Sequence, residues 1–183
     1  MKQSRTRILV GLSVLSVCLA ALVTSFVPHV GAQRLRATIY VTQAAIPRGL
    51  TEKALIGFAR GHQARIMAET TEAEIPSRHW TGNMVISFNT PPGDLEYHAL
   101  FYDVTDGARQ FINDMSIYVS DRDQRTYLQR LNLARPQFRP NRRLEAVITV
   151  SHAEVGTLRV ELRGEEIQRS GQVDFSVEDT HHD

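Results

Sequence analysis

Cysteine and lysine are scarce in this sequence. Cys18 is the single cysteine among 183 residues, so an intramolecular disulfide and a cysteine-based zinc site are excluded. Lys2 and Lys53 are the two lysines, and arginine supplies the rest of the 21 basic residues.

The spacings that mark common catalytic sites are also missing. The histidines are dispersed and form neither an HExxH nor an HxxxH pattern, which disfavours a zinc hydrolase. Serine does not occur in a GxSxG or SxxK context. The turn with Asp121 and Asp123 could offer carboxylates to calcium, but it lacks the glycine and distal glutamate of a calcium loop. We therefore expect a protein that is not an enzyme and has no metal site or cofactor.

Residues 1–32 have the composition of a targeting segment. They begin with basic residues and continue with an uncharged apolar run over 8–27. Small residues then offer a cleavage site after Ala32. The apolar run, about 20 residues, is also long enough to span a bilayer as a helix. The sequence favours a cleaved signal peptide, and a retained membrane anchor is the alternative.

Loss of residues 1–32 would change the charge of the chain. Lys2, Arg5 and Arg7 would be removed, leaving 18 basic residues against 20 acidic ones, a net charge of −2 instead of +1. The basicity belongs to the targeting segment, so it gives no argument for binding nucleic acid. An exported chain without disulfides is typical of a bacterial envelope. We expect it to be periplasmic or secreted, or alternatively held at the inner membrane through 8–27.

The centre of the sequence, 82–134, indicates four consecutive strands. Apolar and polar residues alternate in each run, and the turn signals Pro-Pro-Gly at 91–93 and Asp-Gly at 106–107 separate them. Asn113-Asp114 interrupts the alternation and predicts a bulge. Short polar connections favour antiparallel pairing, so we expect a simple meander.

The flanking sequence adds one helix and more strands. Thr51 is a typical N-cap, and apolar residues at helical spacing follow it, so we expect a short helix over 51–60. Val173, Phe175 and Val177 alternate near the C-terminus. We expect further strands at 37–43, 63–70, 144–150, 157–163 and 173–177.

Short strands with turn signals about every 10 residues predict a sandwich or a barrel. We expect a mainly β fold over 33–183, a single antiparallel β-sandwich domain with one short N-terminal helix. The pattern resembles immunoglobulin-like sandwiches, although the Cys…Trp…Cys signature is absent. The alternative is a closed β-barrel of lipocalin type. Phe88, Tyr97, Phe101 and Leu131 would then line a cavity for a small apolar ligand.

Arginines gather in one loop late in the chain. Their guanidinium groups suit bidentate capture of a carboxylate or a phosphate. The alternative is that these arginines are merely solvated, while the loop's phenylalanine plugs one end of the core. The candidate residues for binding an anion or a partner are Arg135, Phe138, Arg139, Arg142 and Arg143.

The export signal, the β-rich body and the missing catalytic motifs together predict a function class. We expect a non-catalytic binding or structural module of the bacterial envelope, whose partner is an envelope protein or an anionic polymer. An exposed strand edge is a second surface that could accept a partner.

Overall fold

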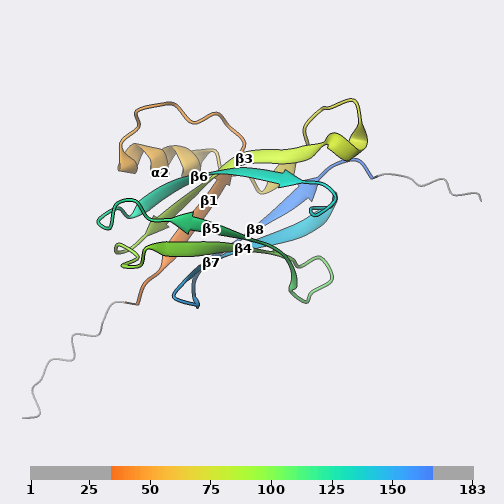
Figure 1. Ribbon diagram of the computed structural model, residues 1–183. Helices are drawn as coiled ribbons and strands as arrows, with labels where there is room; N and C mark the ends of the chain where they lie inside the picture. Colours follow the sequence, from red (N-terminus) through yellow and green to blue (C-terminus); the bar gives the residue numbers. More distant parts are fainter. Residues whose placement is uncertain (1–33, 167–183) are drawn as a thin grey trace, which may run out of the picture. The chain divides into compact units, whose positions relative to one another are not determined.

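Residues 34–166 are the part of the chain that the computed structural model describes, and within them eight strands form two sheets (Figure 1). The strands are β1 (Ala37–Thr42), β2 (Ile66–Ala68), β3 (His79–Phe88), β4 (Glu96–Asp103), β5 (Gln110–Tyr118), β6 (Thr126–Ala134), β7 (Arg142–Val150) and β8 (Ala153–Arg163). The smaller sheet has the order β1-β3-β6, and the larger has the order β2-β8-β7-β4-β5. Neighbouring strands are antiparallel, except that β2 runs parallel to β8.

This strand order defines an immunoglobulin-like β-sandwich. β1, β3 and β6 take the places of strands A, B and E, while β8, β7, β4 and β5 take those of G, F, C and C′. The predicted antiparallel sandwich is therefore confirmed. The barrel alternative is wrong, because the two sheets keep separate edges and do not close on one another.

The predicted meander over 82–134 is also wrong. β4 and β5 form a hairpin, but β3 and β6 pair with each other in the opposite sheet. Within this segment the chain therefore changes sheets twice, after β3 and again after β5. Alternation shows that each strand has a buried face, but it does not show which sheet that face belongs to. The predicted bulge lies one residue from its expected place, since Phe101 pairs with Asn113 and Tyr102 with Phe111, which leaves Ile112 extra.

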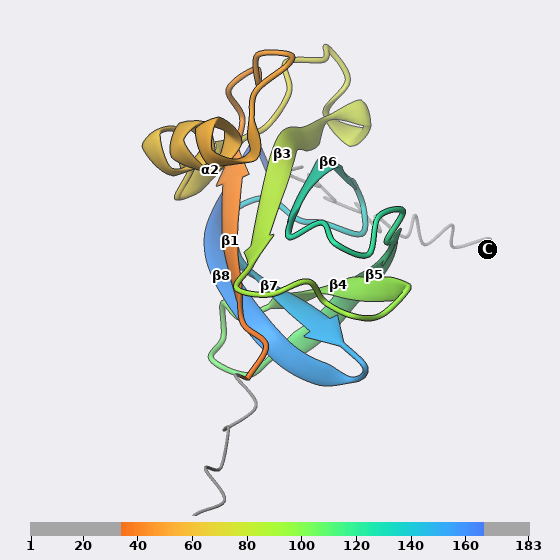
Figure 2. The same ribbon diagram turned by 90° about the vertical axis from the view of Figure 1, so that its left-hand side faces the viewer.

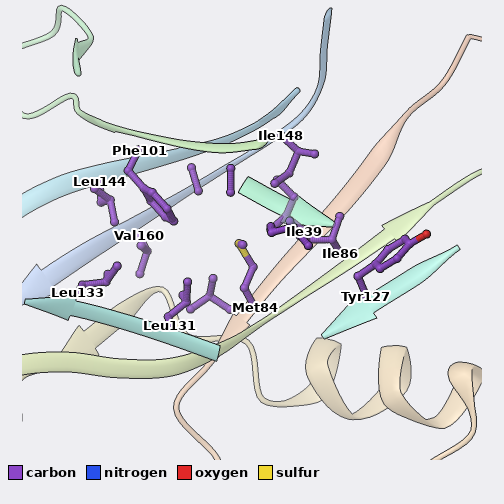
Figure 3. Close-up of a cluster of buried hydrophobic side chains, with 14 of the residues drawn as sticks. Ile39, Met84, Ile86, Phe101, Tyr127, Leu131, Leu133, Leu144, Ile148 and Val160 are labelled. Carbon is purple, nitrogen blue, oxygen red and sulfur yellow. The ribbon is translucent and has the colours of Figure 1, made fainter. Parts of the chain in front are cut away.

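The core fills the space between the inner faces of the two sheets (Figure 3). Phe88, Tyr97 and Tyr127 meet edge to face, with ring centroids 5.2 to 5.8 Å apart. Phe101 and Leu131 are buried in the same cluster. These side chains pack against one another, so the expectation that they would line a ligand cavity is not met.

The helix α2 (Glu52–Gly61) covers the outer face of the smaller sheet (Figure 2). Its N-cap is Thr51, whose hydroxyl oxygen accepts a hydrogen bond from the Ala54 N–H at 3.4 Å. Ala59 of α2 packs on Tyr40 and Val85, from β1 and β3. The predicted helix over 51–60 is confirmed with bounds shifted by one residue. A single turn of 3-10 helix, η1 (Ile75–Ser77), precedes β3.

The other strands occur at the predicted places, with bounds shifted by a few residues, and only 66–68 of the range 63–70 is a strand. The expected strand at 173–177 and the targeting segment at 1–32 lie outside the described residues. Of the helices that the structure describes, none has the length and apolar character needed to cross a membrane.

Candidate functional site

The β6–β7 connection and the start of β7, residues 135–143, form the arginine loop. Its phenylalanine, Phe138, is buried and meets Phe101 edge to face with ring centroids 5.9 Å apart. The Phe138 N–H also donates to the Ala134 carbonyl at 3.1 Å, so the loop folds back on the end of β6. Phe138 thus fills one end of the core and holds the loop in place.

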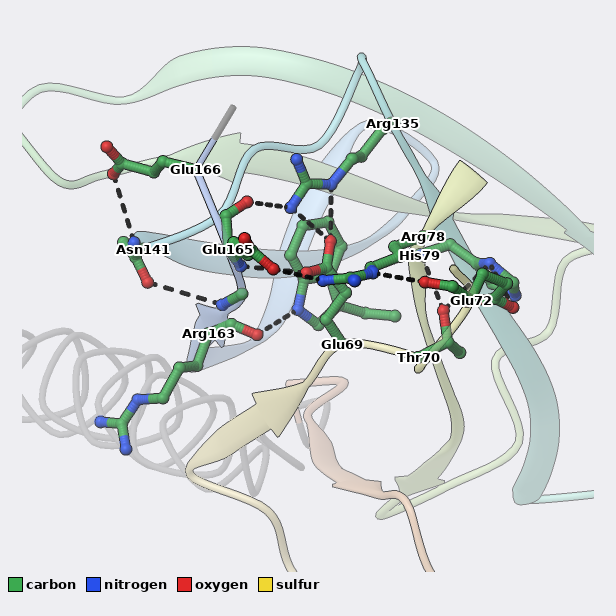
Figure 4. Close-up of polar contacts among 12 residues, drawn as sticks. Glu69, Thr70, Glu72, Arg78, His79, Arg135, Asn141, Arg163, Glu165 and Glu166 are labelled. Atoms are coloured by element: carbon green, nitrogen blue, oxygen red, sulfur yellow. Dashed lines mark hydrogen bonds and ion pairs between the residues drawn. The ribbon is translucent and has the colours of Figure 1, made fainter. Parts of the chain in front are cut away.

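The Arg135 side chain binds other parts of the same chain (Figure 4). Its buried guanidinium forms an ion pair with the buried carboxylate of Glu69 and lies 5.5 Å from the ring centroid of Trp80. It also donates to the Glu165 carbonyl at 2.6 Å. Removing one partner of a buried ion pair destabilises a fold strongly, because it leaves the other charge buried without compensation. Arg135, which follows β6 of the smaller sheet, therefore fastens the loop to the segments that follow β2 and β8 of the larger sheet.

Arg142 and Arg143 bind the turn between β4 and β5. Arg142 donates to the carboxylates of Asp103 at 2.7 Å and Asp106 at 2.9 Å. Arg143 donates to the Thr105 carbonyl at 2.6 Å. Burial alone would raise the pKa of Asp103, but hydrogen bonds from Thr105 and Arg142 hold it below its usual range. These two arginines fix a neighbouring turn.

Arg139 differs from the other three arginines. Its side chain is exposed, and it makes no hydrogen bond or ion pair with any residue from 34 to 166. Prolines flank it at 136 and 140, and the buried Phe138 precedes it. The loop therefore presents, from a fixed backbone, one exposed guanidinium that has no partner among the described residues.

Two clefts meet at Arg139. The first, the β5 cleft, has a volume of about 270 Å³, and its lining includes Gln110, Phe111, Ile112, Gln137 and Arg139. The second, the proline cleft, has a volume of about 720 Å³ and is lined by Pro76, Pro136 and Pro140 beside Phe138. Arg139 and Arg142 line both. An anion held by Arg139 could therefore extend into either cleft.

A cluster of His98, Asp114 and Ser116 lies on the outer face of β4 and β5. Both Asp114 oxygens are 3.0 Å from the His98 Nδ1, and the Ser116 Oγ is 3.3 Å from the same nitrogen. A serine nucleophile would need the opposite ring nitrogen, with the carboxylate on Nδ1. The arrangement does not provide that relay. Groups of three or more metal-ligating side chains are not found among residues 34–166.

Sequence reasoning missed a buried carboxylate on β7. Glu145 is buried and accepts hydrogen bonds from Arg109 and from Arg159, the latter at 2.8 Å. Burial by itself would raise the pKa of Glu145, but hydrogen bonds from Arg159 and Arg109 lower it below its usual range. An acid inside the apolar run 144–150 was the signal that could have indicated it.

Comparisons with known proteins add little. No protein-family model matches the sequence, and no curated protein matches it. Among solved structures, an immunoglobulin-like protein from Pseudomonas aeruginosa is similar, with a TM-score of 0.40 and 12% sequence identity, covering 73% of this chain and 100% of that one. A TM-score of 0.40 does not establish a common fold, so the immunoglobulin-like assignment rests on the strand order.

Proposed function

We propose that the chain is an exported domain of the bacterial envelope that binds an anionic group of a protein or polymer through Arg139. One observation carries this proposal. Of the four arginines in the arginine loop, Arg139 is the one that is exposed and has no partner among the described residues, while the others bind Glu69, Asp103, Asp106 and Thr105.

Export is supported by the composition of residues 1–32. A charged start, an apolar run and small residues before Gln33 are typical of a signal peptide. We therefore infer a periplasmic or secreted domain, or one anchored in the inner membrane through 8–27. The absence of disulfide-forming cysteines supports a bacterial envelope over a disulfide-stapled secreted module.

The loop suits recognition because it is already ordered. A planar guanidinium binds a carboxylate or a phosphate through two parallel hydrogen bonds. Phe138 and the flanking prolines fix the backbone before a ligand arrives, which lowers the ordering cost of binding. A single exposed ion pair contributes only about 0.2–1 kcal/mol. A useful affinity therefore needs repeated charges or further contacts, which Gln110, Phe111 and Gln137 offer in the β5 cleft.

A non-catalytic role is supported by the geometry of the histidine cluster. His98 meets Asp114 and Ser116 through one and the same ring nitrogen, and these three residues do not line either cleft at Arg139.

Charge reversal at one position tests the proposal. Fluorescent poly-L-glutamate and polygalacturonate are titrated with the full chain, and binding is followed by anisotropy at low salt. Arg139→Glu should weaken binding of at least one probe by about fivefold or more, because it places a carboxylate where the anion binds. The two probes distinguish a peptide carboxylate from a sugar carboxylate.

The matched control is Arg122→Glu. Arg122 is exposed in the turn between β5 and β6 and likewise has no partner among residues 34–166. It undergoes the same change in charge but lies outside both clefts. Equal effects of the two variants would show only non-specific attraction and would overturn the proposal.

A further inference from the structure

The free edge of β5 leads into the cleft where Arg139 lies. From this we infer that the partner is an extended peptide, which pairs antiparallel with β5 and places an acidic C-terminal end in the β5 cleft. This inference rests on the proposed function and names the partner class for the same site. Strand addition to a sheet edge is an established mode of peptide recognition, in which backbone hydrogen bonds give affinity and side chains give specificity.

The first observation is that β5 ends the larger sheet. The Val119 N–H donates to the Leu95 carbonyl at 2.8 Å, so Val119 faces β4. The Ile112 carbonyl accepts from the Gln137 side chain at 3.0 Å and so faces away from β4. In an antiparallel pair, alternate residues direct their backbone groups toward the partner strand. Asp114, Ser116 and Tyr118 therefore direct theirs to the side where residues 34–166 supply no further strand.

The other sheet edges are less available. β2 has three residues. β1 lies against β8 so closely that a Cβ at Gly156 would be 2.4 Å from the Ala37 carbonyl oxygen. On β6, side-chain amides of Gln124 and Gln129 donate to backbone carbonyls of the strand. β5, by contrast, is nine residues long. Its edge is protected by the Gln137 contact near its start and by one charged side chain, Asp114.

The second observation is that β5 exposes large apolar side chains. Phe111 is 61% exposed and Tyr118 is 76% exposed, and they lie near the two ends of the strand. Both are on the outer face, opposite Tyr102 and Glu96 of β4. An added strand with alternating apolar residues would cover Phe111 and Tyr118 together.

Charge sets the direction of the peptide. The β5 cleft lies at the N-terminal end of β5, where Gln110, Phe111 and Ile112 line it together with Arg139. A strand antiparallel to β5 brings its own C-terminal end to this place. Carboxylates at that end, including the terminal one, then face the Arg139 guanidinium, which no residue of the described part of the chain pairs with. A sugar polymer has no regular N–H groups to match the backbone of Asp114, Ser116 and Tyr118.

Hydrogen exchange tests this pairing directly. The probe is a fluorescein-labelled octapeptide, Thr-Val-Thr-Phe-Thr-Val-Glu-Glu, with a free C-terminal carboxylate, added to the full chain. The amides of Asp114, Ser116 and Tyr118 should exchange about tenfold more slowly when the probe is bound, because each gains a backbone hydrogen bond. Methylating every second backbone nitrogen of the probe, in the register that faces β5, should weaken binding by about tenfold. Binding without amide protection, or indifference to methylation, would overturn the inference.

A matched pair of variants tests the same edge from the protein side. Ser116→Pro and Ser116→Ala both remove the hydroxyl, but only proline removes the N–H that faces away from β4. The proline variant should lose probe binding and the alanine variant should keep it. If the proline variant does not fold, the methylated probe still decides the question.

The outcomes separate this inference from the proposed function. Weaker binding in Arg139→Glu without protection of the β5 amides leaves the anion site standing and overturns strand addition. Protection that Arg139→Glu does not weaken supports the edge and overturns the role of Arg139. Protection already present in the free chain would mean that the edge is covered without a partner. If that protection increased with protein concentration, a second copy of the chain would be covering the edge. If it did not, another part of the same chain would be covering it. Both outcomes would overturn the peptide partner.

Discussion

At the scale of single residues, Tyr97 is a polar group in an apolar place. Its ring packs between Phe88 and Tyr127, but its buried hydroxyl has no hydrogen-bond partner among residues 34–166. Burial, with Tyr127 close by, raises the pKa of Tyr97 far above its ordinary value. The hydroxyl therefore stays neutral and costs stability, because it lost its water contacts on folding without a replacement.

Removing this hydroxyl should stabilise the fold. We expect Tyr97→Phe to raise the free energy of unfolding by about 1 kcal/mol, because the ring contacts remain and the unpaired group is gone. Tyr127→Phe is the control, since the Tyr127 hydroxyl donates to the Gln124 carbonyl at 3.0 Å. It should lower the free energy by about 1 kcal/mol. Urea unfolding of both variants measures the difference, and a loss of stability in both would contradict this interpretation of Tyr97.

Glu145 should make stability depend on pH. Its pKa in the fold is lower than the 4.5 of a free glutamate, because hydrogen bonds from Arg159 and Arg109 outweigh the effect of burial. A lowered pKa means that the charged form stabilises the fold above about pH 4.5 and that this contribution is lost as the pH falls through the folded value. Glu145→Gln should be less stable than the wild type at pH 7 and should lose less stability between pH 5 and pH 3. Urea unfolding across this range would contradict the account if the two slopes were the same.

At the scale of elements, two glycines show where backbone packing is tight and where it is loose. Gly156 of β8 allows β1 to approach, since a Cβ would lie 2.4 Å from the Ala37 carbonyl oxygen. Gly57 of α2 has nothing within 4 Å of the place of a Cβ. The same substitution should therefore have opposite effects at these positions.

We expect Gly156→Ala to lower the free energy of unfolding by roughly 1–3 kcal/mol, because β1 must move away from β8. Gly57→Ala should raise it by about 0.5–1 kcal/mol, because alanine is the better helix former and the site is exposed. Thermal unfolding monitored by circular dichroism compares the two. Stabilisation by Gly156→Ala would mean that β1 and β8 do not meet as described.

Local patterns predicted the elements because each strand has one buried face. The alternation at 84–88 reports burial of Met84, Ile86 and Phe88, wherever the strand lies. Which sheet a strand joins depends on pairing between residues far apart in the sequence, as when β3 pairs with β6 across the intervening hairpin. Alternation within one strand does not predict that pairing.

The candidate site shows the same limit. The sequence shows that arginines are concentrated at 135–143, and the structure places all of them in one loop region. Their different roles depend on partners far along the chain. Arg135 pairs with Glu69, 66 residues earlier, and Arg142 pairs with Asp103, 39 residues earlier. Such pairs have no local signal, so it could not be predicted that Arg139 lacks a partner within 34–166.

At the scale of the whole domain, the proposed binding surface lies at one end and one edge of the sandwich. β1 and β8 close the opposite side, and α2 covers the outer face of the smaller sheet. The edge of β5 and the exposed guanidinium of Arg139 meet at the β5 cleft. Anion binding at this cleft requires that the Arg139 guanidinium can reach a ligand, whereas Arg135 and Arg142 are held in internal ion pairs.

The most direct measurement follows the arginine side chains themselves. In nitrogen-15 spectra of the full chain, the Nε–Hε signals are recorded as poly-L-glutamate is added at low salt. The account predicts that the Arg139 signal shifts in step with binding, while those of Arg135 and Arg142 stay where they are because Glu69 and Asp103 already hold them. Binding that leaves the Arg139 signal unchanged, or that moves Arg135 and Arg142 instead, would contradict it.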